Sequence, residues 1–347
     1  MNFYNTQHQY YCGIDLHAKT MYVCILDSEG KKLAHRNIGT DPEYFLKVIA
    51  PYRQDIVVCV ECMFSWYWVA DLCAEEGIPF VLGHALYMRA IHGGKAKNDR
   101  IDSEKIAVLL RGGMLPQSYV YPKKMRSTRD IMRRRTHFMR KRAQLLTHIQ
   151  MTRMQYNLKE FGKSLARKRH RKEVSNLFSD KAARKSMEAN LTMMEHYDEM
   201  LRDLELFINN SAKAHDPDAY RILRSIRGVG KILTLTILYE IDTIHRFPRV
   251  QDFLSYARLV KSKKESAGKN YGSSGSKIGN AHLKWAFSEA AILLMREYEE
   301  AKLFVKKKAK KHGKGKAMSI LATKLGRAAY FMLKNKRSFR PEMFFSA

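Results

Sequence analysis

The pattern of apolar residues changes near residue 122, and this change constrains the fold more than any other feature of the sequence. Before it, apolar runs typical of β-strands are interspersed with segments typical of helices. The predicted strands are 10–15, 21–26, 32–37, 56–60 and 79–82. The predicted helices are 42–52, 66–76 and 103–111. Three strands in succession, then alternating helices and strands, predict a mixed five-stranded sheet with helices packed on it. Beyond residue 122 the patterns are helical, so we predict an α/β fold followed by an all-α region.

We expect three parts: a catalytic α/β domain at residues 1–122, a basic helical region at 123–215, and a mostly helical domain at 216–347. The basic region begins with residues 123–172, where lysine and arginine abound and only Asp130 and Glu160 are acidic. Two seams of apolar residues run along it, one of Ile131, Phe138 and Leu145, the other of Met194, Tyr197, Leu201, Leu204 and Ile208. These seams predict either a coiled-coil dimer contact or an intramolecular helix pair, and the sequence leaves both open.

The charge of the chain indicates its partner. The formal net charge is +29, which favours a polyanion, with nucleic acid ahead of an anionic membrane. No apolar run approaches the roughly 18 residues that a membrane-spanning helix needs, and the N-terminus does not resemble a secretory signal. We therefore expect a cytoplasmic protein associated with the nucleoid and not with a membrane.

The five cysteines all lie within the first 73 residues, among strand-like residues. Cys59 and Cys62 have the spacing of a zinc-binding pair, but no second pair of ligands follows them. We expect buried thiols in a reducing compartment rather than a zinc site.

Four acids stand where α/β active sites form. Asp15 follows one apolar run, Glu61 ends another, and Asp99 and Asp102 share one face at the start of a predicted helix. If the helix crosses the ends of the two strands, four carboxylates converge, and such hard oxygen ligands suit Mg²⁺ or Mn²⁺. The alternatives are a turn residue at Asp15, a surface acid at Glu61 and helix caps at Asp99 and Asp102.

Two further motifs lie in the C-terminal part. An apolar helix is preceded by a turn that contains Gly228, Gly230 and Lys231. Such a turn can bind phosphate through backbone N–H groups, or it can simply be a tight turn between two packed helices. Ser266 lies in a predicted polar loop at residues 262–280. Nothing local would activate its hydroxyl, so by composition the loop reads as a flexible phosphate-contacting segment.

The ordered set of motifs resembles the DEDD transposases of the IS-one-ten type, the bridge-RNA-guided recombinases related to the Piv invertase. Gly13-Ile14-Asp15 with Lys19, then Glu61, then the Asp99–Asp102 pair resemble the N-terminal RuvC-like motifs of this family. The Gly228–Gly230 turn and the stretch from Ser266 to Asn280 resemble its C-terminal domain. Two places depart from the family pattern: Cys62 follows the glutamate where Thr-Gly is usual, and Arg258 begins the segment where Gly-Leu-x-Pro is usual.

The resemblance implies an RNase H fold with Mg²⁺ bound by the acids, and a serine nucleophile that forms a phosphoserine link to DNA. It also implies a tetramer in which acids of one subunit complete the serine site of another, and a structured noncoding bridge RNA that pairs with donor and target DNA. Ser266 is the matching serine, with Ser273, Ser274 and Ser276 as alternatives.

Phosphate contacts are expected from the basic helix, the glycine turn, the serine loop and the lysine run at residues 306–316. The residues are Arg126, Arg129, Arg133, Arg140, Gly228, Gly230, Lys231 and Lys277. Two other functions remain open: a RuvC-like junction endonuclease that uses water without a covalent intermediate, and a non-catalytic nucleic-acid scaffold.

Overall fold

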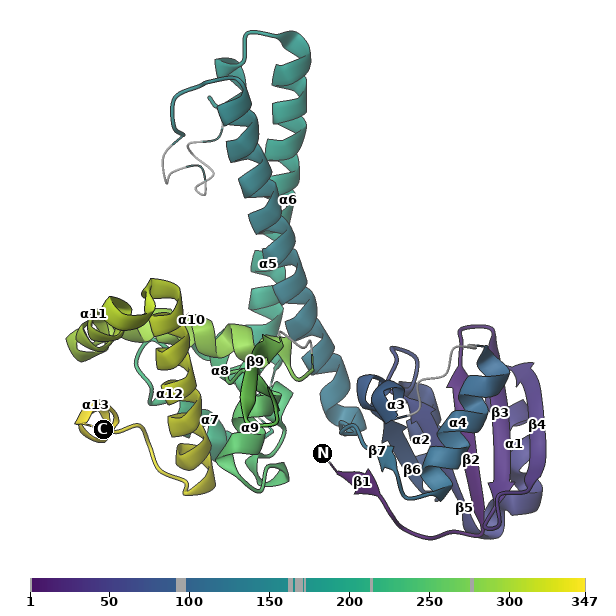
Figure 1. Ribbon diagram of the computed structural model, residues 1–347. Helices are drawn as coiled ribbons and strands as arrows, with labels where there is room; N and C mark the ends of the chain where they lie inside the picture. The colour runs from purple at the N-terminus through teal and green to yellow at the C-terminus, as the bar shows by residue number, and fades with distance from the viewer. Residues whose placement is uncertain are drawn as a thin grey trace. The chain divides into compact units, whose positions relative to one another are not determined.

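The fold is described from a computed structural model, which describes residues 2–91, 98–161, 165, 171, 173–212, 215–274 and 278–346 (Figure 1). The chain divides into two compact units, Met1–Lys124 and Met125–Ala347. The first boundary therefore lies close to the expected one at residue 122. The further division at residue 215 stays a prediction.

The first unit is built on the predicted five-stranded mixed sheet, with strand order β4-β3-β2-β5-β6 (Figure 1). Its strands are β2 (Tyr10–Leu16), β3 (Thr20–Asp27), β4 (Lys32–Gly39), β5 (Ile56–Glu61) and β6 (Phe80–Gly83). The first three pair antiparallel, and β5 and β6 join β2 in parallel. This is the RNase H-like arrangement, and it confirms the predicted fold class.

The helices of this unit begin and end where the sequence provides stops. They are α1 (Pro42–Ile49), α2 (Tyr67–Glu75), α3 (Ala85–Ile91) and α4 (Asp99–Arg111), and a short pair of strands, β1 (Phe3–Tyr4) and β7 (Leu115–Pro116), lies beside the main sheet. Asp41 caps α1 by accepting hydrogen bonds from Glu43 and Tyr44, and Gly77 follows α2 at a positive φ of 67°. Helix α3 was not predicted, and α4 begins four residues before the predicted start at 103.

Apolar side chains cover both faces of the central strands. Val58 and Val60 of β5 pack on one side with Phe45 of α1, whereas Val57 and Cys59 pack on the other with α4. This is why β5 reads as a continuous apolar run rather than an alternating one. Four of the five cysteines are buried, as expected, but Cys62 is exposed because it lies just beyond the end of β5.

Helix α4 lies unusually close to β2 because Gly13 has no side chain. A Cβ at this position would stand 2.4 Å from both the Ser103 carbonyl oxygen and the Ala107 amide nitrogen, which is inside van der Waals contact. The helix backbone therefore rests directly on the strand backbone. This contact fixes where the first turn of α4 lies relative to the end of β2.

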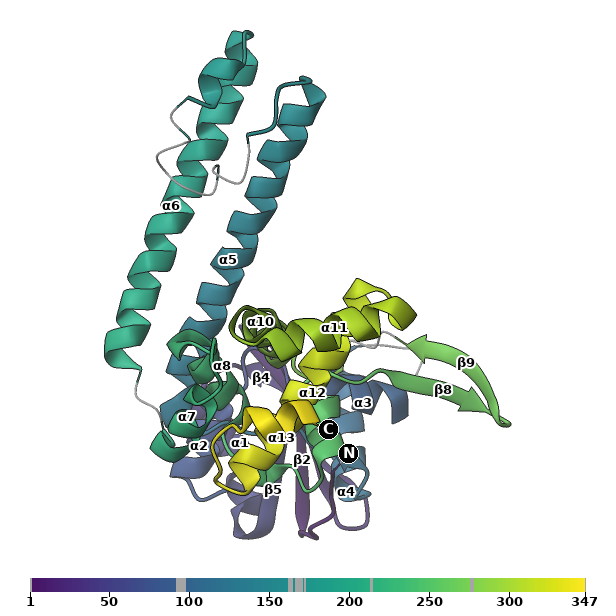
Figure 2. The same ribbon diagram turned by 90° about the vertical axis from the view of Figure 1, so that its left-hand side faces the viewer.

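The second unit begins with two long helices that lie side by side in Figures 1 and 2, α5 (Lys123–Gln155) and α6 (Lys181–Ser211). We call this pair the arm. Phe138 packs against Tyr197, and Arg135 and Arg142 pair with Glu205 and Asp198, so the helices run antiparallel. Of the two arrangements left open by the sequence, the intramolecular pair is the one present in this chain.

The rest of the second unit is a helical body. Its helices are α7 (Pro217–Arg224), α8 (Lys231–Ile241), α9 (Val250–Tyr256), α10 (Ala281–Glu297), α11 (Glu299–His312), α12 (Lys314–Lys334) and α13 (Pro341–Ser346). Asp216 caps α7 by accepting from Ala219, as the break at this point predicts. One hydrophobic core, including Leu238, Phe253, Phe287 and Leu325, joins these helices. No helix in the described ranges combines the length and hydropathy of a membrane span.

The expectation of a long irregular loop at residues 262–280 is wrong. Strands β8 (Ser262–Ser266) and β9 (Lys269–Ser274) form a hairpin, which projects from the helices of its unit in Figure 2. Ala267 and Gly268 both have positive φ, 47° and 72°, as a two-residue type I′ turn requires. The hairpin could not be predicted from the sequence for two reasons. Ala-Gly stands in the turn instead of the usual Asn-Gly, and the strands are too polar to show the alternation of apolar and polar residues that is typical of β-strands.

We predict that Gly13→Ala pushes α4 away from β2 and destabilises the first unit by about 1–3 kcal/mol, the usual cost of overpacking. Hydrogen–deuterium exchange of peptides from β2 and α4 in the full chain should measure the loss of protection. Gly39→Ala is the matched control, because a Cβ at Gly39 meets nothing within 4 Å. Equal exchange in the two variants would contradict a close α4–β2 contact.

Candidate active site

An acidic cluster forms where β2 ends and α4 begins. Nε2 of His17 lies 3.5 Å from Oδ2 of Asp15 and 3.4 Å from Oδ2 of Asp99. The side chain of Asp15 is only 16% exposed, whereas those of His17 and Asp99 are about half exposed, at 51% and 54%. Strand and helix thus bring two of the predicted acids together, with an imidazole between them.

The start of α4 explains how Asp99 comes to the cluster. Asn98 is the N-cap, and its side chain accepts a hydrogen bond of 2.8 Å from the Ile101 amide. Because the cap is supplied by Asn98, the alternative that Asp99 and Asp102 are helix caps is wrong. Both acids lie in the first turn, where the positive end of the helix dipole favours carboxylates.

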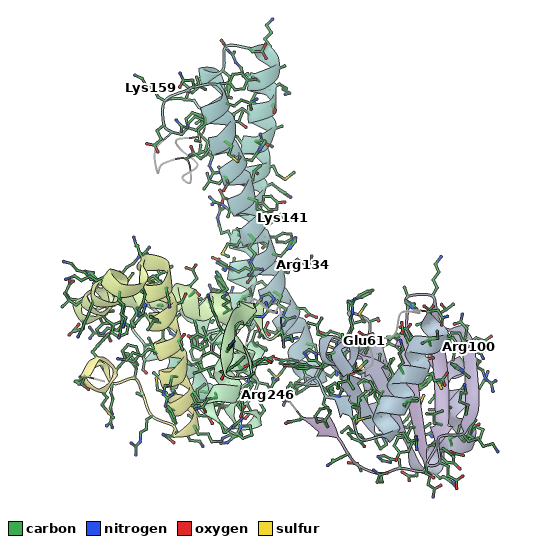
Figure 3. The ribbon with its side chains drawn as sticks, viewed as in Figure 1. Glu61, Arg100, Arg134, Lys141, Lys159 and Arg246 are labelled. Carbon is green, nitrogen blue, oxygen red and sulfur yellow. The ribbon has the colours of Figure 1, made fainter. Side chains whose placement is uncertain are left out.

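Asp102 lies close enough to raise the pKa of Asp15, and Glu61 ends the strand next to β2, but both are outside the group of ligand atoms that lie within 4.8 Å of one another. Ile14 pairs with Val60 in the parallel register of β2 and β5, so Asp15 and Glu61 come next on neighbouring strands. Figure 3 labels Glu61 and Arg100 at the same edge of the first unit. Asp102 is paired with Lys105 at 3.4 Å.

The carboxyl group of Asp15 has an unfavourable electrostatic environment. Burial raises its pKa, His17 lowers it, and the neighbouring charges of Asp99 and Asp102 raise it again, with a net upward shift. Two carboxylates and an imidazole whose ligand atoms lie within 4.8 Å of one another form a donor set that fits a divalent ion. A bound cation would neutralise the repulsion that raises the pKa of Asp15.

His17 was not among the predicted site residues. A signal for it was present, since residues i and i+2 lie on the same face of a strand and His17 comes two residues after Asp15. A histidine beside a predicted metal-binding aspartate is a reasonable further ligand.

Ser266 lies at the end of β8, paired with Lys269 across the type I′ turn, and it is exposed. Among the described residues, no side chain forms a hydrogen bond with its hydroxyl. The hairpin thus presents this serine to solvent without a base of its own. Ser273 and Ser274 lie on β9, whereas Ser276 and Lys277 lie outside the described residues.

Comparison with known proteins matches both units. Residues 12–157 match a family model for transposases of the DEDD IS110 type, and residues 220–306 match the model described as "Transposase IS116/IS110/IS902 family". The chain belongs to this transposase family. It is therefore a DNA cleaving and joining enzyme that acts on insertion-element DNA.

A relative of known name agrees with this assignment. The chain is 23% identical over 340 residues to the transposase for insertion sequence element IS1111A of Coxiella burnetii (strain RSA 493 / Nine Mile phase I). The similarity covers 94% of this chain and 90% of that protein. The four acids fall within the first family match, and Ser266 falls within the second.

A buried carboxylate, Glu240 of α8, lies at the centre of a charged network in the second unit of this transposase. Its side chain is 2% exposed and contacts Arg129 at 3.0 Å and Arg133 at 2.6 Å, both from α5. Asn280 donates to it at 2.7 Å and also caps α10. Asn280 lies six residues beyond β9, so one charged network joins the arm to the segment that leaves the hairpin.

Burial alone would raise the pKa of Glu240, but hydrogen bonds and charges from Arg133 and Arg129 outweigh it and hold the pKa at about 2. The carboxylate is therefore charged throughout the neutral range, and it neutralises the buried guanidinium group of Arg129 and the half-buried one of Arg133. This network was missed from sequence. Its signal was a single glutamate in the apolar run of α8, since a buried acid requires a partner.

The network changes how the basic helix is understood. Arg126 and Arg129 are buried, and Arg129 and Arg133 contact Glu240, so these side chains are engaged inside the unit. Arg140 is exposed, and Figure 3 labels Arg134, Lys141 and Lys159 along the arm. Contact with nucleic acid by the predicted arginines stays a prediction.

The glycine turn before α8 is also partly structural. Gly228 has φ of 85°, and a Cβ there would stand 3.1 Å from Leu293 of α10, so the turn packs against that helix. Gly230 is the N-cap of α8 and has open space around it, and Lys231 donates to the carbonyl of Asn209. The turn does join two packed helices, and phosphate binding at its exposed side stays a prediction.

We predict that Glu240→Gln destabilises the second unit by about 3–5 kcal/mol, because it leaves buried guanidinium charge without a counter-ion. A urea titration in which hydrogen exchange of peptides from α8 and α10 reports unfolding measures the change in the free energy of unfolding. Glu205→Gln is the matched control: it removes the carboxylate that pairs with Arg135, the Glu205 side chain is 38% exposed, and the change should cost less than about 1 kcal/mol. A loss no larger than that of the control would contradict this stabilising role.

The same carboxylate predicts a dependence on pH. The pKa of Glu240 is about 2 in the folded chain against an ordinary value of 4.5, so its stabilisation is complete above pH 4.5. As pH falls from 4.5 towards 2, this contribution is lost. The difference in stability between the wild type and Glu240→Gln should therefore shrink across this interval. A difference that stays constant down to pH 2 would show that the charge is not responsible.

Proposed function

We propose that this transposase cuts and rejoins DNA through a phosphoserine intermediate, with Ser266 as the nucleophile and a structured noncoding RNA as the guide. The active form is a homo-oligomer, a tetramer, acting at the nucleoid in the bacterial cytoplasm. The observation that carries the proposal is the cluster of Asp15, His17 and Asp99 at the edge of an RNase H-like sheet.

The acidic cluster is proposed to hold Mg²⁺ or Mn²⁺. Asp15, Asp99 and His17 would be its ligands. Glu61, at the end of the neighbouring strand β5, and Asp102, in the first turn of α4, are proposed to complete the set. A bound divalent ion supplies neutralisation of phosphate charge and lowers the pKa of an attacking hydroxyl. Asp15 is suited to this task because it is the most buried of the three and is fixed by the strand.

The serine reaction conserves the number of phosphoester bonds. The hydroxyl oxygen of Ser266 forms a bond to phosphorus while the bond to one strand oxygen breaks, and the serine proton leaves with that oxygen or to solvent. Because the new bond is again a phosphodiester, a strand hydroxyl can reverse the reaction and rejoin DNA. The exposed position at a hairpin tip supports this role, since the hydroxyl can approach a duplex without steric hindrance.

Lysine and arginine side chains outside the acidic cluster and the serine hairpin would bind phosphates of the nucleic acid, without contributing sequence specificity. The exposed Arg134, Arg140 and Lys141 of the arm support this role, as do the lysines of α11 at residues 306–311. Sequence choice would then come from pairing with the guide RNA, as it does in other guided systems. Affinity for DNA should accordingly fall steeply with salt.

One observation favours a second function. The Ser266 hydroxyl has no hydrogen-bonded side chain among the described residues, so nothing in its hairpin removes the proton. The acidic cluster would then act alone as a junction endonuclease in which water is the nucleophile.

We predict that Ser266→Ala abolishes strand exchange and also abolishes a covalent protein–DNA adduct on nicked suicide DNA, because the attacking oxygen is gone. Denaturing gel electrophoresis detects the adduct, and phosphopeptide mass spectrometry locates it. Ser273→Ala and Ser274→Ala serve as matched controls on the partner strand. Cleavage by the wild type with no adduct on any serine would favour the endonuclease.

We predict that Asp15→Asn abolishes cleavage and weakens Mn²⁺ binding at least tenfold, while affinity for DNA stays within about twofold, because the cluster loses its most buried charge. Manganese titration by electron paramagnetic resonance reads the binding directly. Glu29→Gln removes an exposed acid from a turn of the same unit and should change neither property. Strand exchange that persists in EDTA would exclude a metal role for the cluster.

A further inference from the structure

A cavity of about 350 Å³ lies in the C-terminal part of the second unit, between α12, the segment 335–340 and α13. Figure 1 shows α13 beside α12, joined to it by this segment. Pockets of about 300–1,000 Å³ are of a size that encloses small organic ligands. This cavity lies outside both family matches, which end at residues 157 and 306.

The wall of the cavity is aromatic and apolar. Phe331 of α12 is 42% exposed and Met343 of α13 is 63% exposed, although a helix normally turns such side chains inward. Phe344 lies deeper and is buried. An open ring on a helix beside a cavity offers a flat face on which a planar group can stack.

The rim of the cavity is cationic. Lys324, Arg327, Arg337 and Arg340 line it, and no aspartate or glutamate does. Within the described residues, none of the three arginines forms an ion pair with a carboxylate; Arg327 lies over Phe331 at 5.6 Å, and Arg340 contacts only the sulfur of Met343. Other arginines of this unit are neutralised by carboxylates, as by Glu240 and Glu205. The charge of this rim therefore calls for an anionic ligand.

A ligand that fits must combine a flat, partly apolar face with negative charge. A purely apolar peptide would leave the three arginines without counter-ions, and phosphates of an intact duplex would leave the ring face and Met343 uncovered. A nucleotide whose base has left the stack satisfies both parts, because every base has a π-face and every phosphate carries charge. Arginine beside an aromatic ring is a common combination for such bases.

We propose that this cavity binds an unpaired nucleotide of a nucleic-acid strand, with the base stacked on Phe331 and its phosphates held by Arg337 and Arg340. Arg327, which already lies over the ring, extends the stacking surface. The inference rests on the proposed function only in that the transposase handles unpaired strands. The ligand chemistry is the same for a DNA strand opened during exchange and for a single-stranded part of an RNA.

The test is binding of short fluorescein-labelled oligothymidylate, oligouridylate and a DNA duplex to the full-length chain, measured by fluorescence anisotropy. Phe331→Leu keeps an apolar residue but removes the ring, and should weaken single-strand binding about fivefold or more while duplex binding is unchanged. Arg337→Gln should weaken single-strand binding as well. If these substitutions weaken binding of oligothymidylate more than that of oligouridylate, the natural ligand is a DNA strand. If they weaken binding of oligouridylate more, it is an RNA strand.

Matched controls lie on the arm. Phe207→Leu removes another exposed ring, 54% exposed on α6, and Arg202→Gln removes another exposed arginine of the same helix. Single-strand affinity unchanged in Phe331→Leu, an equal loss in Phe207→Leu or an equal loss on duplex would overturn the proposal. A change in oligomer size by sedimentation in Phe331→Leu would also overturn it, since the cavity would then hold a second copy of the chain. Because only binding is measured, failure of the serine chemistry leaves the result unaffected.

Discussion

A charge buried in a protein interior must be neutralised there, and in the second unit this requirement falls on Glu240. The carboxylate lies in an apolar helix and is matched by two arginines of α5 and by the amide of Asn280. The arginines come from α5, the carboxylate from α8 and the amide from the start of α10, so the network cannot form until these three helices are in place. The packing of these helices therefore includes a charged contact that must be satisfied as well as the apolar core.

The same network shows that net charge is a poor measure of the surface that faces nucleic acid. Some of the 63 lysines and arginines are paired internally with acids, as in Arg129–Glu240 and Arg142–Asp198. Helical periodicity separates the paired cations of α5 from exposed ones such as Arg134 and Lys141. Electrostatic attraction of DNA would then come from the remaining exposed side chains rather than from the helix as a whole.

The sheet and the acids were predictable because strands buried on both faces are continuous apolar runs, and polar groups that follow them gather at one edge. The close approach of α4, which brings Asp99 to Asp15, depends on the absence of a side chain at Gly13. A single glycine in a strand does not show from sequence which element packs against it. The Ala267–Gly268 turn lacked the usual turn residues. The partner of Glu240 is 111 residues away at Arg129, a separation that no local pattern encodes.

The contact between Gly13 and α4 bears on which ion the proposed metal site would accept. Strand and helix touch through their backbones, with no layer of deformable side chains between them, so the spacing of Asp15 and Asp99 cannot easily widen. A metal site in which the spacing of Asp15 and Asp99 is fixed would discriminate between cations by their radius. Mg²⁺ takes oxygen ligands at about 2.0–2.1 Å and Ca²⁺ at about 2.3–2.6 Å, with more ligands. The missing methyl group of one glycine would thus act, through rigidity, as a filter against the larger ion.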